Sequence, residues 1–204
     1  MPLVYLPVSD PGPEPATLAT SPTTLAGLRV AALDNGKPNA NVVLGFLAAM
    51  LADRTGAEVS LVTKKGPQGR SANAAIPMAD DIFERLRAEA DVVVTGLADC
   101  GSCTAYSVHD AIELEKVGIP AVVVTTTEFE PVATTLAASF GLAEVRRLVL
   151  PHPLGGTDEA TLRRCGRRRR STTWWRTSWR RHEHRPRPGR QGRAGHGLGR
   201  GHRA

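Results

Sequence analysis

The sequence predicts a three-layer α/β/α sandwich around a mainly parallel five-stranded sheet, with a flavodoxin-like or related Rossmann-like strand order. Five short runs rich in Val, Leu, Ile and Ala alternate with stretches whose apolar residues recur at helical spacing. Because these short runs are apolar throughout, they are typical of strands that are covered on both faces. Such strands pair in parallel through right-handed helical crossovers, which favours a layered architecture.

The predicted elements follow one another in strict alternation. We expect the strands at residues 28–33, 58–63, 92–97, 119–124 and 145–150. We expect the helices at residues 39–55, 78–89, 104–117 and 129–140.

The connections between these elements carry further signals. Asn39 or Asn41 is suited to cap the first helix, and Thr157 to cap a final helix after the last strand. Residues 66–77 predict a long loop, and loops of this length are often used to bind ligands.

Charge divides the chain into two unlike parts. Residues 1–164 hold 13 basic and 19 acidic side chains, whereas residues 165–204 hold 13 arginines and a single acid, Glu183. We interpret residues 165–204 as a basic, low-complexity, disordered tail made by frame-shifted translation. If the codon of Thr173 ends in G, the segment Thr173-Trp174-Trp175-Arg176 read from that base encodes Val-Val-Ala, which suits a helix. The alternative is a genuine basic arm that binds nucleic acid.

The rest of the chain divides into a leader and one domain. Residues 1–26 are rich in Pro, Thr and Ser and predict a flexible leader, which leaves residues 27–164 as an α/β domain. The leader lacks a basic start, and the chain has no apolar run long enough to cross a bilayer. We therefore expect a cytoplasmic protein with no membrane partner. In that compartment a Cys-x-x-Cys pair is more typical of redox or metal chemistry than of a structural disulfide.

Two cysteines form the centre of the predicted site, in the segment Asp99-Cys100-Gly101-Ser102-Cys103. Where a strand ends and a helix begins, unpaired N–H groups and the helix dipole favour a thiolate. Cys100 is placed to attack a substrate, and Cys103 to resolve the resulting mixed disulfide. Alternatively, one thiolate attacks carbon or serves as an acid or base, or both cysteines are buried structural residues. Zinc is disfavoured, because a second Cys-x-x-Cys or a suitably spaced His pair is absent.

Polar residues also follow the other predicted strands, and the carboxyl ends of parallel strands meet at one edge, where ligands bind. His152 is a candidate general acid or base, although it could instead hold its proline-rich loop by hydrogen bonds. Asp99 and the hydroxyls of residues 125–127 are candidates to assist proton transfer and oxyanion stabilisation. The candidate ligand-binding residues are Asp34, Asn35, Lys37, Lys64, Ser102, Thr125 and Thr126. Neither a dinucleotide fingerprint nor a phosphate-binding loop motif occurs, so no cofactor is predicted.

Three segments resemble the UGSC family of (seleno)proteins. They are residues 33–40, which read Leu-Asp-Asn-Gly-Lys-Pro-Asn-Ala, the cysteine segment 99–103 with its helix, and Pro-His-Pro at 151–153. The resemblance spans residues 28–164. In that family the first motif position can be selenocysteine, and Cys100 stands at this position. The resemblance thus implies a reactive role for Cys100 and a thiol-based redox activity, without naming a substrate.

The sequence as a whole favours a thiol-dependent enzyme, an oxidoreductase acting on a small-molecule or thiol substrate with a redox partner protein. A cysteine-based isomerase or lyase on a small carboxylic acid is the first alternative. Its layout would be similar to the aspartate/glutamate racemase group, which uses a cysteine pair from two half-domains, whereas this chain has one. The second alternative is a non-catalytic module in which Asp34, Lys37 and Lys64 hold a small acidic ligand. Nucleic-acid binding rests only on the basic tail.

Overall fold

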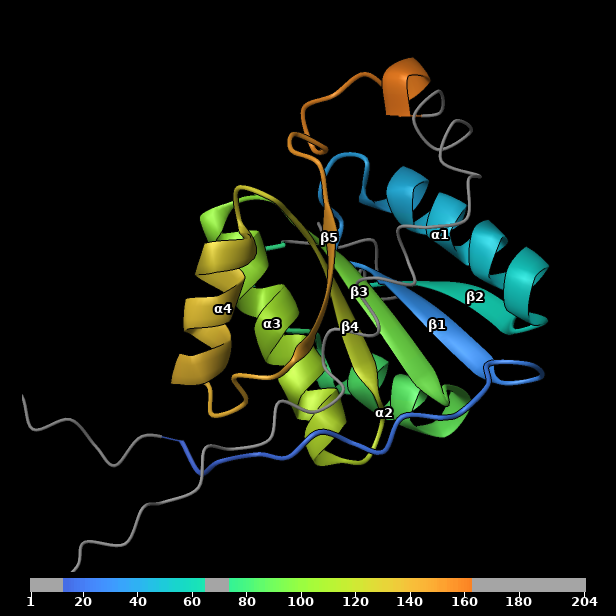
Figure 1. The fold of residues 1–204 in the computed structure, drawn as a ribbon, viewed down its shortest axis with the longest axis vertical. Coiled ribbons are helices and arrows are strands. Elements are labelled where there is room, and N and C mark those ends of the chain that lie inside the picture. Colours follow the sequence, from blue (N-terminus) through green and yellow to red (C-terminus); the bar gives the residue numbers. More distant parts are fainter. Residues whose placement is uncertain (1–12, 65–73, 163–204) are drawn as a thin grey trace, which may run out of the picture.

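The computed structural model describes residues 13–64 and 74–162 of the chain, which form a single parallel sheet flanked by helices (Figure 1). The strands are β1 (Arg29–Asp34), β2 (Glu58–Thr63), β3 (Val92–Ala98), β4 (Ala121–Thr126) and β5 (Arg146–Leu150). The helices are α1 (Ala40–Thr55), α2 (Asp80–Glu89), α3 (Gly101–Lys116) and α4 (Glu130–Ser139). The strand order is β2-β1-β3-β4-β5, the flavodoxin-like order, so the predicted fold class is confirmed.

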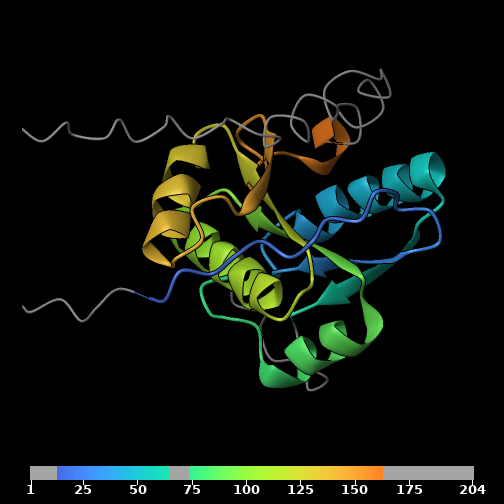
Figure 2. The ribbon, with the colours of Figure 1, turned by 60° about the horizontal axis from the view of Figure 1, so that its bottom comes forward.

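Helices cover both faces of the sheet, as the apolar strands require (Figures 1 and 2). On β1, Ala31 and Leu33 pack into the core under α2, α3 and α4. The alternate residues Val30 and Ala32 pack with α1 on the opposite face. Because successive side chains of a strand point to opposite faces, a strand buried on both sides must be apolar at nearly every position.

The centre of the sheet brings β3 unusually close to β4 at the end that leads to the cysteines. The register of the two strands shifts between Thr95 and Ala98. A Cβ atom on Gly96 would lie 3.0 Å from the Cβ atom of Val124, so glycine is what permits this approach. β3 ends directly after this irregularity, and Asp99 and Cys100 follow it at the carboxyl edge of the sheet.

The described part of the predicted leader, residues 13–26, is hydrogen-bonded to the domain. The amide of Ala16 donates to the carbonyl of Gly141, 3.0 Å away, and the amide of Ala19 donates to the Glu115 carboxylate, 2.6 Å away. Arg146 pairs with the same carboxylate and donates to the Ala19 carbonyl. Composition alone could not reveal these partners, which lie 96 to 127 residues away in the chain.

Two predicted helix caps are replaced by other contacts. Asn39 precedes α1 with a left-handed backbone (φ 68°), and its amide donates to the carbonyls of Leu154 and Thr157 instead of capping the helix. Asn41 lies inside α1. The Thr157 hydroxyl donates to the Pro153 carbonyl, whereas the Asp158 carboxylate accepts from the amide of Thr161 and caps the last described turn.

Several predicted segments lie outside the described residues: the start of the leader (1–12), most of the predicted 66–77 loop, and the whole basic tail (165–204). Within the described ranges, the helices are all too short or too polar to span a bilayer.

Candidate functional site

The cysteine pair forms the start of α3. Cys100 is the N-cap residue, with extended backbone angles (φ −151°, ψ 169°), and Cys103 occupies the third helical position. The amide of Cys100 donates to Sγ of Cys103 at 2.9 Å, and the amide of Cys103 donates to Sγ of Cys100 at 3.4 Å. This arrangement has the geometry of a capping box, with sulfur atoms in place of the usual hydroxyl and carboxylate. The helix therefore begins three residues earlier than its apolar spacing predicts, and the predicted placement of both cysteines is confirmed.

The two thiols differ in their access to solvent. Cys103 is fully buried, whereas Cys100 is half-buried and lines a pocket. Their Cα atoms are 5.5 Å apart and their sulfur atoms are in contact. Ser102 is exposed, with its hydroxyl 3.9 Å from Sγ of Cys100.

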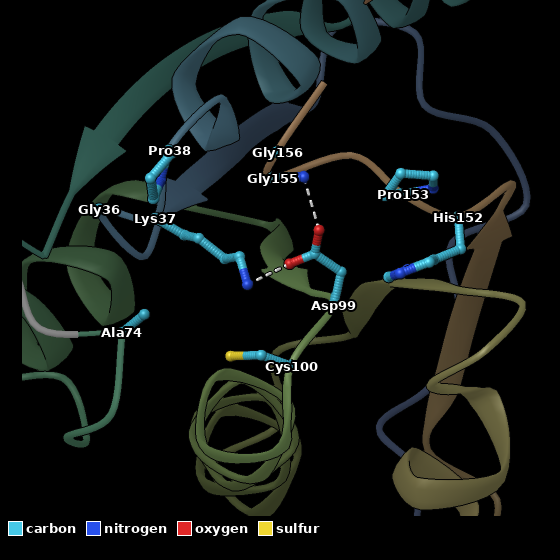
Figure 3. Close-up of a pocket in the computed structure, with 10 residues that line it drawn as sticks. All are labelled: Gly36, Lys37, Pro38, Ala74, Asp99, Cys100, His152, Pro153, Gly155 and Gly156. Carbon is cyan, nitrogen blue, oxygen red and sulfur yellow. Dashed lines mark hydrogen bonds and ion pairs between the residues drawn. The ribbon is translucent and has the colours of Figure 1, made fainter. Parts of the chain in front are cut away.

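The pocket has a volume of about 560 Å³ and opens at the carboxyl edge of the sheet, where β1, β3 and β5 end (Figure 3). Its wall combines the loop after β1, the start of α3 and the loop after β5. The residues that line it are Gly36, Lys37, Pro38, Ala74, Asp99, Cys100, His152, Pro153, Gly155 and Gly156.

An ion pair lies next to the cysteines and joins three loops (Figure 3). Nζ of Lys37 is 2.5 Å from Oδ1 of Asp99 and 3.6 Å from Sγ of Cys103. The amide of Gly155 donates to the other carboxylate oxygen of Asp99 at 2.6 Å. The Asp99 side chain is 3% exposed and that of Lys37 is 17% exposed, so the pair is largely removed from water. The structure thus brings Lys37, Asp99 and both cysteines together, as the sequence predicts.

His152 lies on the side of Asp99 opposite Lys37 (Figure 3). Its Nδ1 atom is 3.1 Å from the hydroxyl of buried Thr126, and its ring packs against Phe129 with centroids 5.6 Å apart. Its other ring nitrogen is free of these contacts. The position therefore fits both predicted roles, proton transfer at the pocket and attachment of the proline-rich loop.

Three predicted ligand-binding residues lie behind the pocket wall. The Asp34 carboxylate accepts from the amide of Gly36 at 2.7 Å. Asn35 is fully buried, accepts from the amide of Lys37 at 3.2 Å and donates to the Leu97 carbonyl at 3.0 Å. Both residues shape the loop that carries Lys37. Thr125 is also fully buried, and its hydroxyl donates to the carbonyl at the end of β3.

Lys64 lies in a separate buried cluster at the end of β2. Its ammonium group pairs with the Asp110 carboxylate at 2.6 Å and donates to the Ile76 carbonyl at 2.7 Å. Asp110 also accepts from the amide of Met78 and raises the pKa of neighbouring His109 above its usual range, while partial burial of the imidazole opposes this shift. Lys64 therefore links the end of β2 to the Ile76 carbonyl and to α3. It is not one of the described residues that line the pocket.

Glycines are the part of the site that the sequence reasoning missed. A Cβ atom on Gly155 would lie 2.5 Å from Cε of Lys37 and 2.9 Å from a carboxylate oxygen of Asp99. A side chain at this position would therefore force the lysine stem or the carboxylate to shift. The signal available in the sequence is the Gly155-Gly156 dipeptide a few residues after a predicted strand. Among the described residues, no cluster of three or more His, Cys, Asp or Glu side chains could hold a metal.

The fold and the site together define a flavodoxin-like α/β protein with a thiol pair at the β3–α3 turn. The model of the UGSC family matches residues 4–173, and the chain belongs to this family. The match is longer than the stretch of residues 28–164 over which the motifs predict it. No match was found among curated proteins.

Proposed function

We propose that this protein is a thiol-dependent oxidoreductase in which Cys100 attacks a disulfide substrate and Cys103 resolves the mixed disulfide. One observation carries the proposal: Cys100 lines the pocket, while Cys103 is fully buried in the first turn of the same helix. A substrate in the pocket could reach only the first thiol. The second thiol, in the same helical turn, would then attack Sγ of Cys100.

The environment of the pair supports the thiolate chemistry that this role needs. Both sulfur atoms accept hydrogen bonds from backbone amides at the positive end of α3. Lys37 adds a positive charge 3.6 Å from the buried sulfur. The family also supports a reactive first position, because selenocysteine can replace the residue equivalent to Cys100.

The proposed reaction is thiol–disulfide exchange in two steps. The Cys100 thiolate attacks one sulfur of a substrate disulfide, forms a mixed disulfide and expels the first substrate thiolate, to which His152 can supply a proton. The Cys103 thiolate then attacks Sγ of Cys100, forms the intramolecular disulfide and expels the second substrate thiolate. The substrate gains the two electrons that the cysteine pair loses. Two equivalents of a small thiol, or one dithiol of a partner protein, return the pair to its reduced form and leave as a disulfide.

The substrate class that we propose is a small disulfide. A volume of about 560 Å³ lies within the range of small-molecule pockets. The charges of Lys37 and Asp99 in the pocket wall cancel each other, so the substrate needs no charge of its own to bind there. We place the reaction in the cytoplasm, where low-molecular-weight thiols keep cysteine pairs reduced.

The proposal is tested by trapping the mixed disulfide with hydroxyethyl disulfide, a small uncharged probe, and weighing the intact protein. A Cys165→Ser background leaves only the two motif thiols to react. With Cys103→Ser, we expect a stable adduct on Cys100 and one released thiol per chain. With Cys100→Ser, we expect no adduct. Cys100→Ser should lose turnover with dithiothreitol as reductant, and Lys116→Gln, which removes an exposed lysine near the other end of α3, should retain it.

The same experiment separates the alternatives. Turnover of a small carboxylic acid by the fully reduced protein, with no electron acceptor, would indicate the isomerase or lyase instead. If the wild-type protein forms no adduct and shows no turnover, and neither serine substitution changes this, the protein is a binding module.

A further inference from the structure

We infer that Lys37 is a catalytic residue of the second step, the counter-ion of the Cys103 thiolate, and that Asp99 and Gly155 position it. This inference rests on the proposed thiol–disulfide exchange. It reassigns Lys37, which the sequence suggests as a ligand-binding residue, to the resolving thiol. The step it governs is the attack of Cys103 on the mixed disulfide at Cys100.

Distance and burial place the charge on Cys103. Nζ of Lys37 donates to Sγ of Cys103 at 3.6 Å, and Cys103 is fully buried. A thiolate in such a place loses its contact with water and needs a nearby cation or N–H donor to be stable. Lys37 provides the cation, and the amide of Cys100 provides the N–H at 2.9 Å.

A chain of contacts fixes the ammonium group at that distance. Asp99 holds Nζ at 2.5 Å, and Gly155 holds the carboxylate from the other side through its amide at 2.6 Å. Gly155 also leaves the room that the lysine stem occupies, since a Cβ atom there would lie 2.5 Å from Cε of Lys37. The lysine side chain therefore cannot swing freely into the pocket, and its charge stays near the buried sulfur.

The second step exchanges one sulfur–sulfur bond for another. Cys103 loses its proton to solvent, and the ammonium group of Lys37 stabilises the thiolate that remains. The thiolate forms the bond to Sγ of Cys100, and the bond between Cys100 and the substrate sulfur breaks. The electron pair leaves with the substrate thiolate. Among the described residues, the other titratable groups that line the pocket are Asp99, Cys100 and His152.

The test measures the two steps separately by rapid quench and intact mass, again with hydroxyethyl disulfide and in the Cys165→Ser background. Lys37→Gln should form the mixed disulfide at nearly the wild-type rate. Resolution should slow about tenfold, the lower end of the effect of a neighbouring charge on a thiol, because Asp99 already offsets part of the lysine charge. The pH midpoint of resolution should move upward, which a merely structural lysine would not cause.

Two further variants serve as a control and as a substitute for Lys37→Gln. Lys116→Gln removes an exposed lysine near the other end of α3 and should leave both rates unchanged. If Lys37→Gln does not fold, Gly155→Ala displaces the lysine stem with the lysine retained and should slow resolution in the same way.

The outcomes distinguish this inference from the proposed function. An adduct in Cys103→Ser together with wild-type resolution in both Lys37→Gln and Gly155→Ala would overturn the role of Lys37 alone. Absence of an adduct in every variant, Cys103→Ser included, would overturn the proposed exchange itself.

Discussion

Single side chains at this site were predictable by type but not by partner. The sequence indicates that Asn35, Lys64 and Lys37 all follow strands of a parallel sheet, and the structure places all three at that edge. It also shows that Asn35 donates to Leu97, 62 residues away, and that Lys64 pairs with Asp110, 46 residues away. Such pairings depend on how the strands are ordered in the sheet. The residues next to a lysine in the sequence therefore do not reveal whether it binds a ligand or forms a buried ion pair.

Lys64→Met tests this structural role at the residue scale. It leaves the buried Asp110 carboxylate without its cation, and such a change costs about 3 kcal/mol. We expect the lower end of the range for buried pairs, because the amide of Met78 and the imidazole of His109 remain near Asp110. Urea unfolding of the purified protein measures the change.

The matched control is Lys116→Met, which breaks an exposed ion pair with Glu113 on the same helix as Asp110 and should cost at most about 1 kcal/mol. Equal losses for the two variants would mean that the Lys64 pair does not stabilise the fold.

At the scale of elements, the sequence predicts the strands well because their apolar runs are continuous. It predicts helix starts less well because caps depend on geometry. The start of α3 is the clearest case: apolar spacing begins at Thr104, but sulfur atoms cap the helix from Cys100. Cysteine is not among the usual N-cap residues, so propensity gives no reason to begin the helix there. The loop after β5 shows the same limit, since the fit of Gly155 against Lys37 needs both loops in place.

The cap makes its own prediction. Cys100→Ala removes the acceptor of the Cys103 amide and should lower the free energy of unfolding by up to about 1 kcal/mol. Cys100→Ser keeps an acceptor and should have little effect on stability. Urea unfolding under reducing conditions distinguishes the two. If Cys100→Ser loses more unfolding free energy than Cys100→Ala, the sulfur does not act as a cap. The activity of the serine variants would then have to be compared at equal fractions of folded protein.

At the scale of the whole molecule, the flavodoxin-like strand order explains why the site forms where it does. The carboxyl ends of β1, β3 and β5 converge on one edge, so Lys37, Cys100 and His152 meet although 115 residues separate the first from the last. The arginine-rich residues 165–204, which give the chain its net positive charge, lie outside the described residues. The apolar pattern of the sequence predicts the fold class and the edge of the sheet that carries the site. The residues of the pocket wall become apparent only when the loops are assembled in the structure.

The central claim is that Cys100 is an activated nucleophile, and the pH dependence of its alkylation tests this claim most directly. Iodoacetamide labelling of the reduced protein in the Cys165→Ser and Cys103→Ser background reports on Cys100 alone. We predict a midpoint well below about 8.5, the ordinary value for a free thiol, with fast labelling at neutral pH. A midpoint at or above that value, with slow labelling, would contradict the claim and make Cys100 a structural cysteine.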